Sequence, residues 1–345
     1  MTEPTAMRTE IGQQPAALRA TLDSLTPRSD EATALARDCR QVLFIARGTS
    51  DNAAVYGTYL LQAHAGMLAT LASPSIATEY HSRLNLSGVL AVALSQSGAT
   101  EEIVETLAWA RDCGARTLAI TNGGGSPLTQ VADLAFVTSA GAELAVPATK
   151  TFTTQLAALA VLAIALGADL DPGLLAAVPD EIERMLAAPD DLEPMVADLA
   201  GAVGVVVSGR GHAYAAALEL ALKLKEACYL HAMGLSWADL LHGPIAVVDA
   251  NTPAIIVAAD SGPALPGSID LARRVVAAGA RAYAIGGGPG LAAASSLAVP
   301  GPRLPEWLAP LGLIVPGQLL TEALSRRRGI DPDNPRGLSK VTQTA

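Results

Sequence analysis

The chain of 345 residues is half hydrophobic, has a formal net charge of −10 and contains only 23 lysines and arginines. This length suits two domains of about 150 residues, and the Ala, Leu and Val content favours helices packed on a parallel sheet. The lack of a basic run argues against a nucleic-acid partner. No leader pattern is visible and the longest apolar run, 157–166, is too short to cross a bilayer, so we expect a cytoplasmic protein without membrane contact.

The cysteines and histidines do not have the spacing of a metal or redox site. Cys39, Cys113 and Cys228 form no C-x-x-C pair, so we expect them to be reduced and structural. The histidines form no H-E-x-x-H group, and no phosphate-binding P-loop is present. Gly209-Arg210-Gly211 lacks the third glycine of a dinucleotide fingerprint. We therefore expect no metal and no other cofactor.

Strand, polar turn and helix alternate along the first half of the chain. This order requires a parallel sheet with helices on both faces, and ligands of such sheets bind beyond the carboxyl ends of the strands. The two polar turns are therefore the expected binding edge. The strand, turn and helix of the first pass are 42–46, 47–52 and 53–63, and those of the second are 88–94, 95–100 and 101–112.

The second half repeats this order after a proline-rich linker. Gly114–Ile120 and Gly279–Ile285 are similar in sequence, which indicates a duplicated domain. We predict an α/β fold of two tandem domains, each a doubly wound, flavodoxin-like parallel sheet flanked by helices. The expected parts are a helical lead over 1–34, a first domain over 35–169, a linker helix over 170–195, a second domain over 196–330 and a C-terminal tail over 331–345.

The two turns of the first half have the composition of a phosphate site. Hydroxyl groups at the start of a helix, beside backbone N–H groups that the helix leaves unpaired, can bind an anion without a basic surface. Serine and threonine are also good N-caps, so capping alone could explain either turn. Two such turns on one sheet favour the phosphate site. The candidates are Ser95, Gln96, Ser97 and Thr100, with Gly48, Thr49 and Ser50 from the first turn.

A helix expected over 215–233 concentrates titratable groups in a chain poor in charge. Lys223 and Glu226 are three residues apart and therefore share one face of this helix. Taken alone, they could be an ion pair on a solvated strip. His242 follows, directly before a Gly-Pro turn.

Six ordered motifs resemble the isomerase half of glucosamine-6-phosphate synthase, which is built from two sugar isomerase (SIS) domains. The similarity runs from about Glu10 to Lys340, nearly the whole chain. The motifs are residues 95–101, 148–155, 209–211, 221–226, 242–244 and 331–340.

The resemblance implies a role for each matching residue. Glu226 matches the glutamate that moves a proton between C1 and C2 of the sugar, and Lys223 the lysine beside it. His242 matches the ring-opening histidine, and Lys340 the lysine that forms an imine with the open-chain sugar. Backbone near Val146 would contact the sugar, and the hydroxyl-rich turns would hold its phosphate. In that family the histidine comes from the partner subunit, which implies a homodimer with shared active sites.

Departures from the synthase bear on the reaction. The synthase begins with a glutaminase domain that has an N-terminal cysteine, whereas here residue 2 is threonine, so we expect no glutaminase domain and no glutamine-derived ammonia. Arg47 stands where the synthase has cysteine, which looks more like the stand-alone SIS enzymes. We therefore expect a phosphosugar isomerase and deaminase that converts glucosamine 6-phosphate to fructose 6-phosphate and ammonia.

Two alternatives stay open. One is an isomerase or deglycase for another phosphorylated sugar, such as galactosamine 6-phosphate or a ketose-amine 6-phosphate. The other is a non-catalytic regulator that binds a sugar phosphate.

Overall fold

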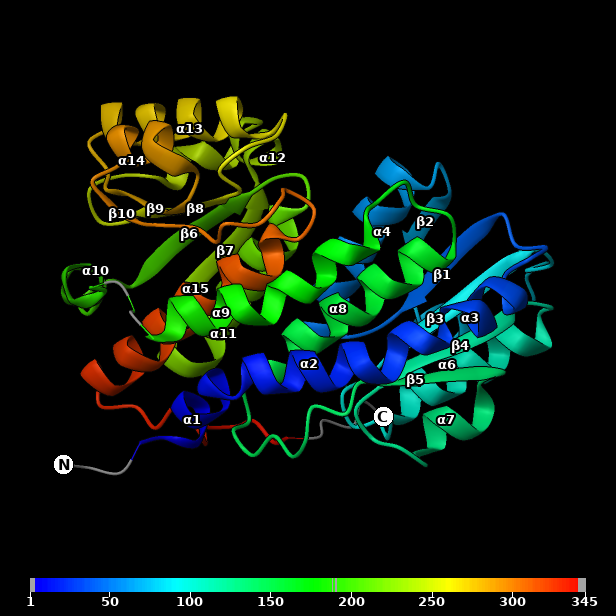
Figure 1. Ribbon diagram of the computed structural model, residues 1–345. Coiled ribbons are helices and arrows are strands. Elements are labelled where there is room, and N and C mark those ends of the chain that lie inside the picture. The colour runs from blue at the N-terminus through cyan, green and yellow to red at the C-terminus, as the bar shows by residue number, and fades with distance from the viewer. Residues whose placement is uncertain (1–3, 188, 190, 341–345) are drawn as a thin grey trace. The chain divides into compact units, whose positions relative to one another are not determined.

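The computed structural model describes residues 4–187, 189 and 191–340 and divides the chain into two compact units (Figure 1). Among the described residues, the first-sheet unit contains 16–143, 150–176 and 339–340. The second-sheet unit contains 4–15, 144–149, 177–187, 189 and 191–338. Of the predicted parts, residues 1–3 of the lead, 188 and 190 of the linker and 341–345 of the tail lie outside the described residues.

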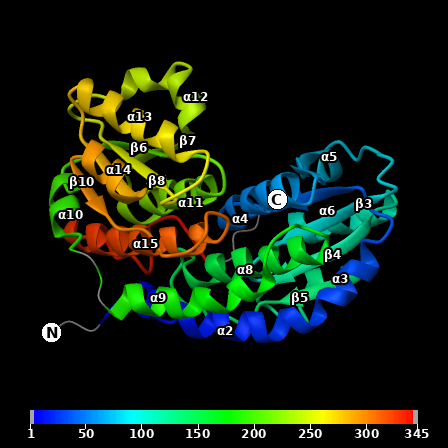
Figure 2. The ribbon, with the colours of Figure 1, turned by 45° about the horizontal axis from the view of Figure 1, so that its top comes forward.

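The first sheet has five parallel strands in the order β2-β1-β3-β4-β5. Helices α3, α4 and α8 pack together on one face, while α6 packs against β3 and β4 with α5 and α7 beside it (Figure 2). The strands are β1 (Gln41–Ile45), β2 (Leu68–Leu71), β3 (Val89–Leu94), β4 (Arg116–Thr121) and β5 (Leu134–Val137). The helices are α2 (Gln14–Leu25), η1 (Thr26–Arg28), α3 (Ser29–Leu35), α4 (Thr49–His64), α5 (Ser75–Thr78), α6 (Glu101–Asp112), α7 (Pro127–Val131), α8 (Lys150–Ala165) and η2 (Pro172–Ala176).

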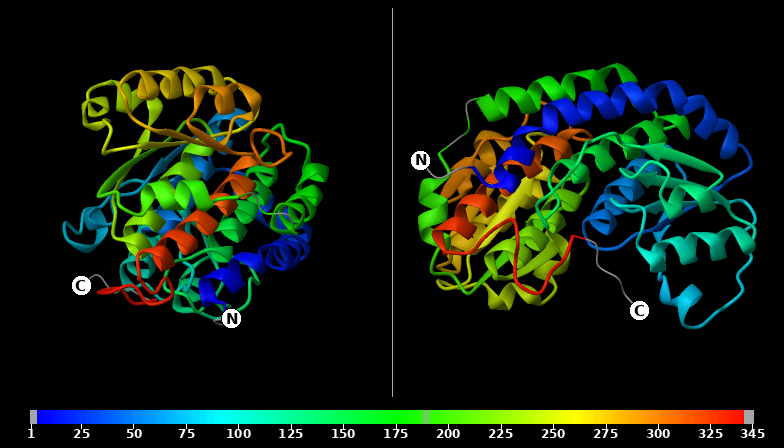
Figure 3. Two further views of the ribbon diagram at one scale, coloured as in Figure 1. Left: turned by 90° about the vertical axis from the view of Figure 1, so that its left-hand side faces the viewer. Right: turned by 90° about the horizontal axis from the view of Figure 1, so that it is seen from below.

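The second sheet repeats the topology of the first, with five parallel strands in the order β10-β9-β8-β6-β7. In the left panel of Figure 3 the yellow α13 lies on one face of this sheet and the red α15 on the other. The strands are β6 (Gly204–Gly209), β7 (His231–Ser236), β8 (Ala254–Ala258), β9 (Ala282–Gly286) and β10 (Leu297–Val299). The helices are α1 (Ala6–Gly12), α9 (Ala177–Ala187), α10 (Glu193–Leu199), α11 (Ala213–Cys228), α12 (Trp237–Leu241), η3 (Pro244–Val247), α13 (Leu265–Ala277), α14 (Gly288–Ala294) and α15 (Ala309–Arg327).

Taken from the opposite edge, the second sheet has the same order as the first, in which the second strand lies outside the first and the third lies on its other side. This is the order of doubly wound, flavodoxin-like sheets, whose ligands bind at the carboxyl ends of the first and third strands. The predicted fold class is therefore confirmed for both sheets.

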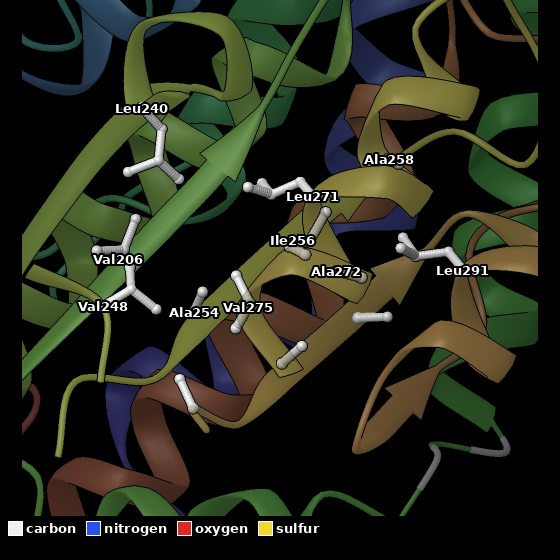
Figure 4. Packing of buried hydrophobic residues seen from close by; sticks show 13 residues of the cluster. Val206, Leu240, Val248, Ala254, Ile256, Ala258, Leu271, Ala272, Val275 and Leu291 are labelled. Atoms are coloured by element: carbon white, nitrogen blue, oxygen red, sulfur yellow. The ribbon is translucent and has the colours of Figure 1, made fainter. Parts of the chain in front are cut away.

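The packing of each unit uses small residues to bring helices close to the strands. In the first core Ala91 and Ala93 of β3 face Ile103 and Leu107 of α6. In the second core, shown in Figure 4, aliphatic side chains of β6 and β8 meet those of α13 and α14. Fully burying one such aliphatic side chain stabilises a fold by about 1.5–3 kcal/mol. The scarcity of aromatic residues is thus compensated by close aliphatic packing.

The helix expected over 215–233 is shorter than predicted. α11 ends at Cys228, because Tyr229 has φ of 53°, in the left-handed region that a bulky residue rarely adopts. Residues His231–Ser236 instead form β7, an edge strand paired with β6. The sequence of this segment is apolar and lacks glycine and proline before Gly234, so it reads as a continued helix. The short strands β2, β5 and β10 were likewise not predicted.

Among the residues that the structure describes, no helix combines the length and the apolar character that a membrane span requires.

Candidate active site

The turn that follows β3 is held in shape by its own hydroxyl groups. The Ser95 hydroxyl is 3.3 Å from that of Thr100 and accepts a hydrogen bond from the Gly98 N–H at 3.2 Å. The Ser97 hydroxyl accepts one from the Ala99 N–H, also at 3.2 Å. Gly98 has φ of +65°, and a Cβ atom there would lie 2.1 Å from the Ser126 hydroxyl. This turn therefore requires glycine and is rigid before any ligand binds.

Thr100 shows that the hydroxyls of this turn are not simply helix caps. It is the N-cap residue of α6, yet its side chain makes no capping hydrogen bond. The start of α6 therefore keeps the partial positive charge of a helix N-terminus without a hydroxyl cap. The alternative in which capping explains the turn is wrong for Thr100.

The turn after β1 lies at the same edge of the first sheet. β1 and β3 are hydrogen-bonded neighbours, with Ile45 opposite Ala93, so both turns leave adjacent strand ends. Gly48, with φ of +56°, is the N-cap of α4, and Thr49 begins that helix. The buried Ser50 hydroxyl accepts a hydrogen bond of 3.0 Å from the Gln155 amide on α8. The structure thus brings the two predicted phosphate-binding turns together.

Arg47 supplies a cation at this edge. Its guanidinium donates to both carboxylate oxygens of Glu102, at 2.9 and 2.7 Å, and this hydrogen-bonded pair raises the pKa of Arg47. Glu102 lies in the first turn of α6, where a carboxylate would repel a bound phosphate. Arg47 neutralises that charge and is itself half exposed.

The buried face of α11 carries an acid–base cluster. The Lys223 ammonium lies 2.5 Å from a carboxylate oxygen of Glu226 and 3.3 Å from one of Glu219. The side chains of Lys223 and Glu219 are 1% and 0% exposed, and that of Glu226 is 23% exposed. The solvated-strip alternative is therefore wrong, since α11 packs against β6, β7 and α15.

The charge of Lys223 follows from this environment. Burial alone lowers the pKa of Lys223, but the nearby carboxylates of Glu219 and Glu226 more than offset burial and raise the pKa above its ordinary value. The lysine is therefore an ammonium at neutral pH. It can hold Glu226 in place and stabilise negative charge on a nearby oxygen, but it cannot act as a base.

The remaining residues predicted in the second-sheet unit lie on exposed or half-buried backbone. His242 is exposed at the C-cap of α12, where its N–H donates to the Asp239 carbonyl at 3.1 Å. Val146 is half-buried, and its N–H donates to the carbonyl of Asp333 at 2.9 Å. The same Asp333 accepts hydrogen bonds of 2.7 Å from Ala6 and Met7 through its carboxylate, which ties part of the tail down.

Lys340 has a partner in the first-sheet unit that the sequence did not suggest. Its ammonium donates to a carboxylate oxygen of Glu143 at 2.8 Å. The sequence reasoning missed Glu143 and interpreted Glu219 as a structural charge, whereas the structure places Glu219 beside Lys223. The spacing of four residues between Glu219 and Lys223 was a usable signal, whereas nothing in the sequence marked Glu143.

Comparison with known proteins identifies the family. A family model described as SIS domain matches residues 35–165 and 198–296. Glutamine--fructose-6-phosphate aminotransferase [isomerizing] of Methanothermobacter thermautotrophicus is 35% identical over 340 residues, which cover 97% of this chain and 56% of that relative. The chain thus spans little more than half the length of this curated relative.

Two solved structures match over nearly their full length. A candidate phosphosugar isomerase from Silicibacter pomeroyi gives a TM-score of 0.85 at 33% identity and covers 96% of this chain and 100% of its own. The C-terminal domain of glucosamine-fructose-6-phosphate aminotransferase from Francisella tularensis gives 0.84 at 27% identity, with 97% and 99% covered.

Proposed function

The chain belongs to the SIS domain family, and we propose that it is a phosphosugar isomerase that converts glucosamine 6-phosphate and water to fructose 6-phosphate and ammonia. The observation that carries this proposal is the pairing of Lys223 with Glu226 on α11. A carboxylate held by a buried ammonium and still 23% exposed is suited to exchange a proton with a bound substrate.

The rigid turn of Ser95–Thr100 supports a phosphorylated substrate. Three hydroxyls, a helix N-terminus and Arg47 offer donors to a phosphate, and the acidic chain needs no basic surface to bind it. The similar solved structures support the same class of substrate, because both are described as enzymes of phosphorylated sugars.

The reaction assigns one task to each side chain. His242, contributed by the partner in a homodimer, opens the sugar ring. Glu226 takes the proton from C2 and returns it to C1, while Lys223 stabilises the negative charge that develops on the neighbouring oxygen. The product carries an imine at C2. The amine of Lys340 attacks this carbon and displaces the substrate nitrogen as ammonia, so that the sugar is joined to Lys340 as an imine, and water hydrolyses that imine to the ketone and frees the lysine. The backbone at Val146 contacts the sugar.

A substrate panel tests this proposal. Glucosamine 6-phosphate, galactosamine 6-phosphate, a ketose-amine 6-phosphate and fructose 6-phosphate with ammonia are each incubated with the protein, and ketose, aldose and ammonia are measured. We expect equal amounts of fructose 6-phosphate and ammonia from glucosamine 6-phosphate. Turnover of another member of the panel alone would move the assignment to that sugar. Saturable binding without any turnover would make the protein a sugar-phosphate-binding regulator and contradict the proposal.

A second candidate function is synthesis of the amino sugar. It is favoured by the 35% identity to an aminotransferase over nearly the whole chain. The same panel distinguishes synthesis from deamination. Synthesis would give net glucosamine 6-phosphate from fructose 6-phosphate and ammonia, under conditions in which no ammonia is released from glucosamine 6-phosphate.

A further inference from the structure

Glu143 is a fully buried residue in the first-sheet unit, and its carboxylate lies against the first turn of helix α8. Its side chain is 0% exposed. The Thr151 N–H donates to one of its oxygens at 3.1 Å and the Thr151 hydroxyl to the other at 2.6 Å. The N-terminus of α8, a helix of 16 residues, adds a favourable dipole. These partners belong to the body of the unit and hold the carboxylate in one orientation.

A carboxylate buried in this way attracts a cation. Burying an unpaired charge costs more than burying a paired one, and the Thr151 donors are neutral. Lys340, 197 positions later in the chain, brings a cation to Glu143, at 2.8 Å from the oxygen that also accepts from the Thr151 hydroxyl. The Lys340 side chain remains 25% exposed.

The two partners of this ion pair differ in burial and in their place in the fold. Glu143 is fixed by Thr151 and by burial, whereas Lys340 is near the end of the described chain and lies in no helix or strand. Ordering a long lysine side chain costs conformational entropy, and its partial exposure weakens the attraction. Glu143 is therefore a preformed acceptor, and the Lys340 side chain can leave it.

We propose that Glu143 is a fixed binding partner, here called the socket, that positions the Lys340 ammonium. The inference rests on the proposed function for the use of that lysine, because the resemblance assigns Lys340 to imine formation with the open-chain sugar. Glu143 is a positioning residue in this proposal: it acts on the sugar only through Lys340. The socket holds the reactive lysine in one place while no sugar is bound and gives the tail a defined position to return to.

The lysine content of the chain makes this proposal directly testable. The lysines of the sequence are Lys150, Lys223, Lys225 and Lys340. Lys150 and Lys223 are buried, Lys225 is exposed, and Lys340 is partly covered by Glu143. The extent of acylation at each lysine can be measured by peptide mass spectrometry. Acylation of Lys340 reports whether Glu143 covers it, exposed Lys225 is the internal standard, and the two buried lysines verify folding.

The first experiment compares the rates of acetylation at Lys340 and Lys225 in the wild type and in Glu143→Gln. Glutamine retains the size and an acceptor oxygen but not the charge. We expect the ratio of the two rates to rise roughly three- to tenfold in the variant, while Lys150 and Lys223 stay unmodified. An unchanged ratio in a folded variant would overturn the proposal. Glu31→Gln, which removes a carboxylate from an exposed ion pair with Arg28, is the matched control and leaves the ratio unchanged.

A second variant covers the case in which Glu143→Gln does not fold. Thr151→Val removes the hydroxyl that shares an oxygen of Glu143 with Lys340 but keeps the backbone donor. We expect the ratio of acetylation at Lys340 to that at Lys225 to rise by a smaller factor, roughly two, because the carboxylate loses its fixed orientation. A ratio equal to that of the wild type in Thr151→Val would count against the socket.

Lys340→Gln separates this inference from the proposed function. Full turnover in Lys340→Gln would show that the imine role is wrong, while the acetylation ratio would still decide the socket. Loss of turnover in Lys340→Gln together with an unchanged acetylation ratio in Glu143→Gln would support the proposed function and contradict the proposed role of Glu143.

Discussion

The corresponding edges of the two sheets show how a duplicated fold can retain its topology and change its chemistry. In the first sheet, β3 is followed by Ser97-Gly98, and hydroxyls line the turn. In the second, β8 is followed at the same distance by Ser261-Gly262, and both glycines have positive φ. The Ser-Gly pair and the positive φ of its glycine are thus repeated.

What differs is the side chain that lies against each turn. A Cβ atom on Gly262 would lie 2.4 Å from the carboxylate of Glu306, which also lies 3.5 Å from the His212 ring. Arg210, at the position that Arg47 occupies in the first sheet, stacks at 4.7 Å on Trp237. A carboxylate thus occupies the place where a phosphate would sit. Instead of an anion site, the second sheet carries helix α11, to which we assign the proton transfer.

The largest effect that this comparison predicts is in α11. Glu226→Gln should lower kcat by roughly a hundred- to ten-thousandfold with little change in KM, because the amide cannot carry the proton. Steady-state ketose formation from glucosamine 6-phosphate measures both constants. Lys225→Gln, the exposed neighbour, is the control and should behave like the wild type. Wild-type kcat in Glu226→Gln would show that another group moves the proton.

The next effect is in the first-sheet turn. Ser97→Ala combined with Thr100→Val removes two hydroxyl donors and should raise KM for the phosphosugar roughly ten- to a hundredfold, at an unchanged kcat. Ser261→Ala is the equivalent change in the second sheet and should leave KM unaltered. The comparison fails if Ser261→Ala raises KM as much as the double variant does.

A smaller effect is expected at Arg47. Arg47→Ala leaves the Glu102 carboxylate uncompensated at the start of α6 and should raise KM about two- to fivefold, more at low ionic strength than at high. Glu102→Gln removes that charge and should lower KM or leave it unchanged. A decrease of KM in Arg47→Ala would show that the arginine does not assist phosphate binding.

The smallest effect concerns stability at the second edge. Burial raises the pKa of Glu306 above its ordinary value, so folding takes up protons there and stability falls as pH rises from the unfolded-state pKa through the folded-state pKa. The Glu306→Gln variant has no carboxyl group at this position, so its stability does not fall with pH for this reason. Urea unfolding at pH 5 and pH 8 should therefore show the variant gaining stability relative to the wild type at the higher pH. The opposite trend would mean that the carboxylate is held there by a favourable charge.

Much of this arrangement could be predicted from the sequence because it depends on local patterns. The strand, turn and helix of Val89–Asp112 follow from an apolar run, a hydroxyl-rich turn and a clear helical period, and the structure has them at nearly those positions. The Lys223–Glu226 contact follows from helical spacing alone.

The remainder depends on contacts between distant segments or on unusual backbone. The end of α11 is set by Tyr229 in a left-handed conformation, which no residue statistic favours for tyrosine. The burial of α11 depends on its packing against α15, β6 and β7, and the Glu143–Lys340 pair joins residues 197 positions apart. Carboxylates such as Glu143 and Glu306 look like surface charges until the fold encloses them.

The central claim is that the Ser95–Thr100 turn binds the phosphate of a sugar substrate. The most direct test is the ratio of kcat/KM for glucosamine 6-phosphate to that for glucosamine, measured in the wild type, in the Ser97→Ala and Thr100→Val double variant and in Ser261→Ala. Several charge-assisted hydrogen bonds predict a ratio of at least about a thousand in the wild type and in Ser261→Ala, and a much smaller one in the double variant. A ratio near one in the wild type, or one that the double variant retains, would contradict the claim.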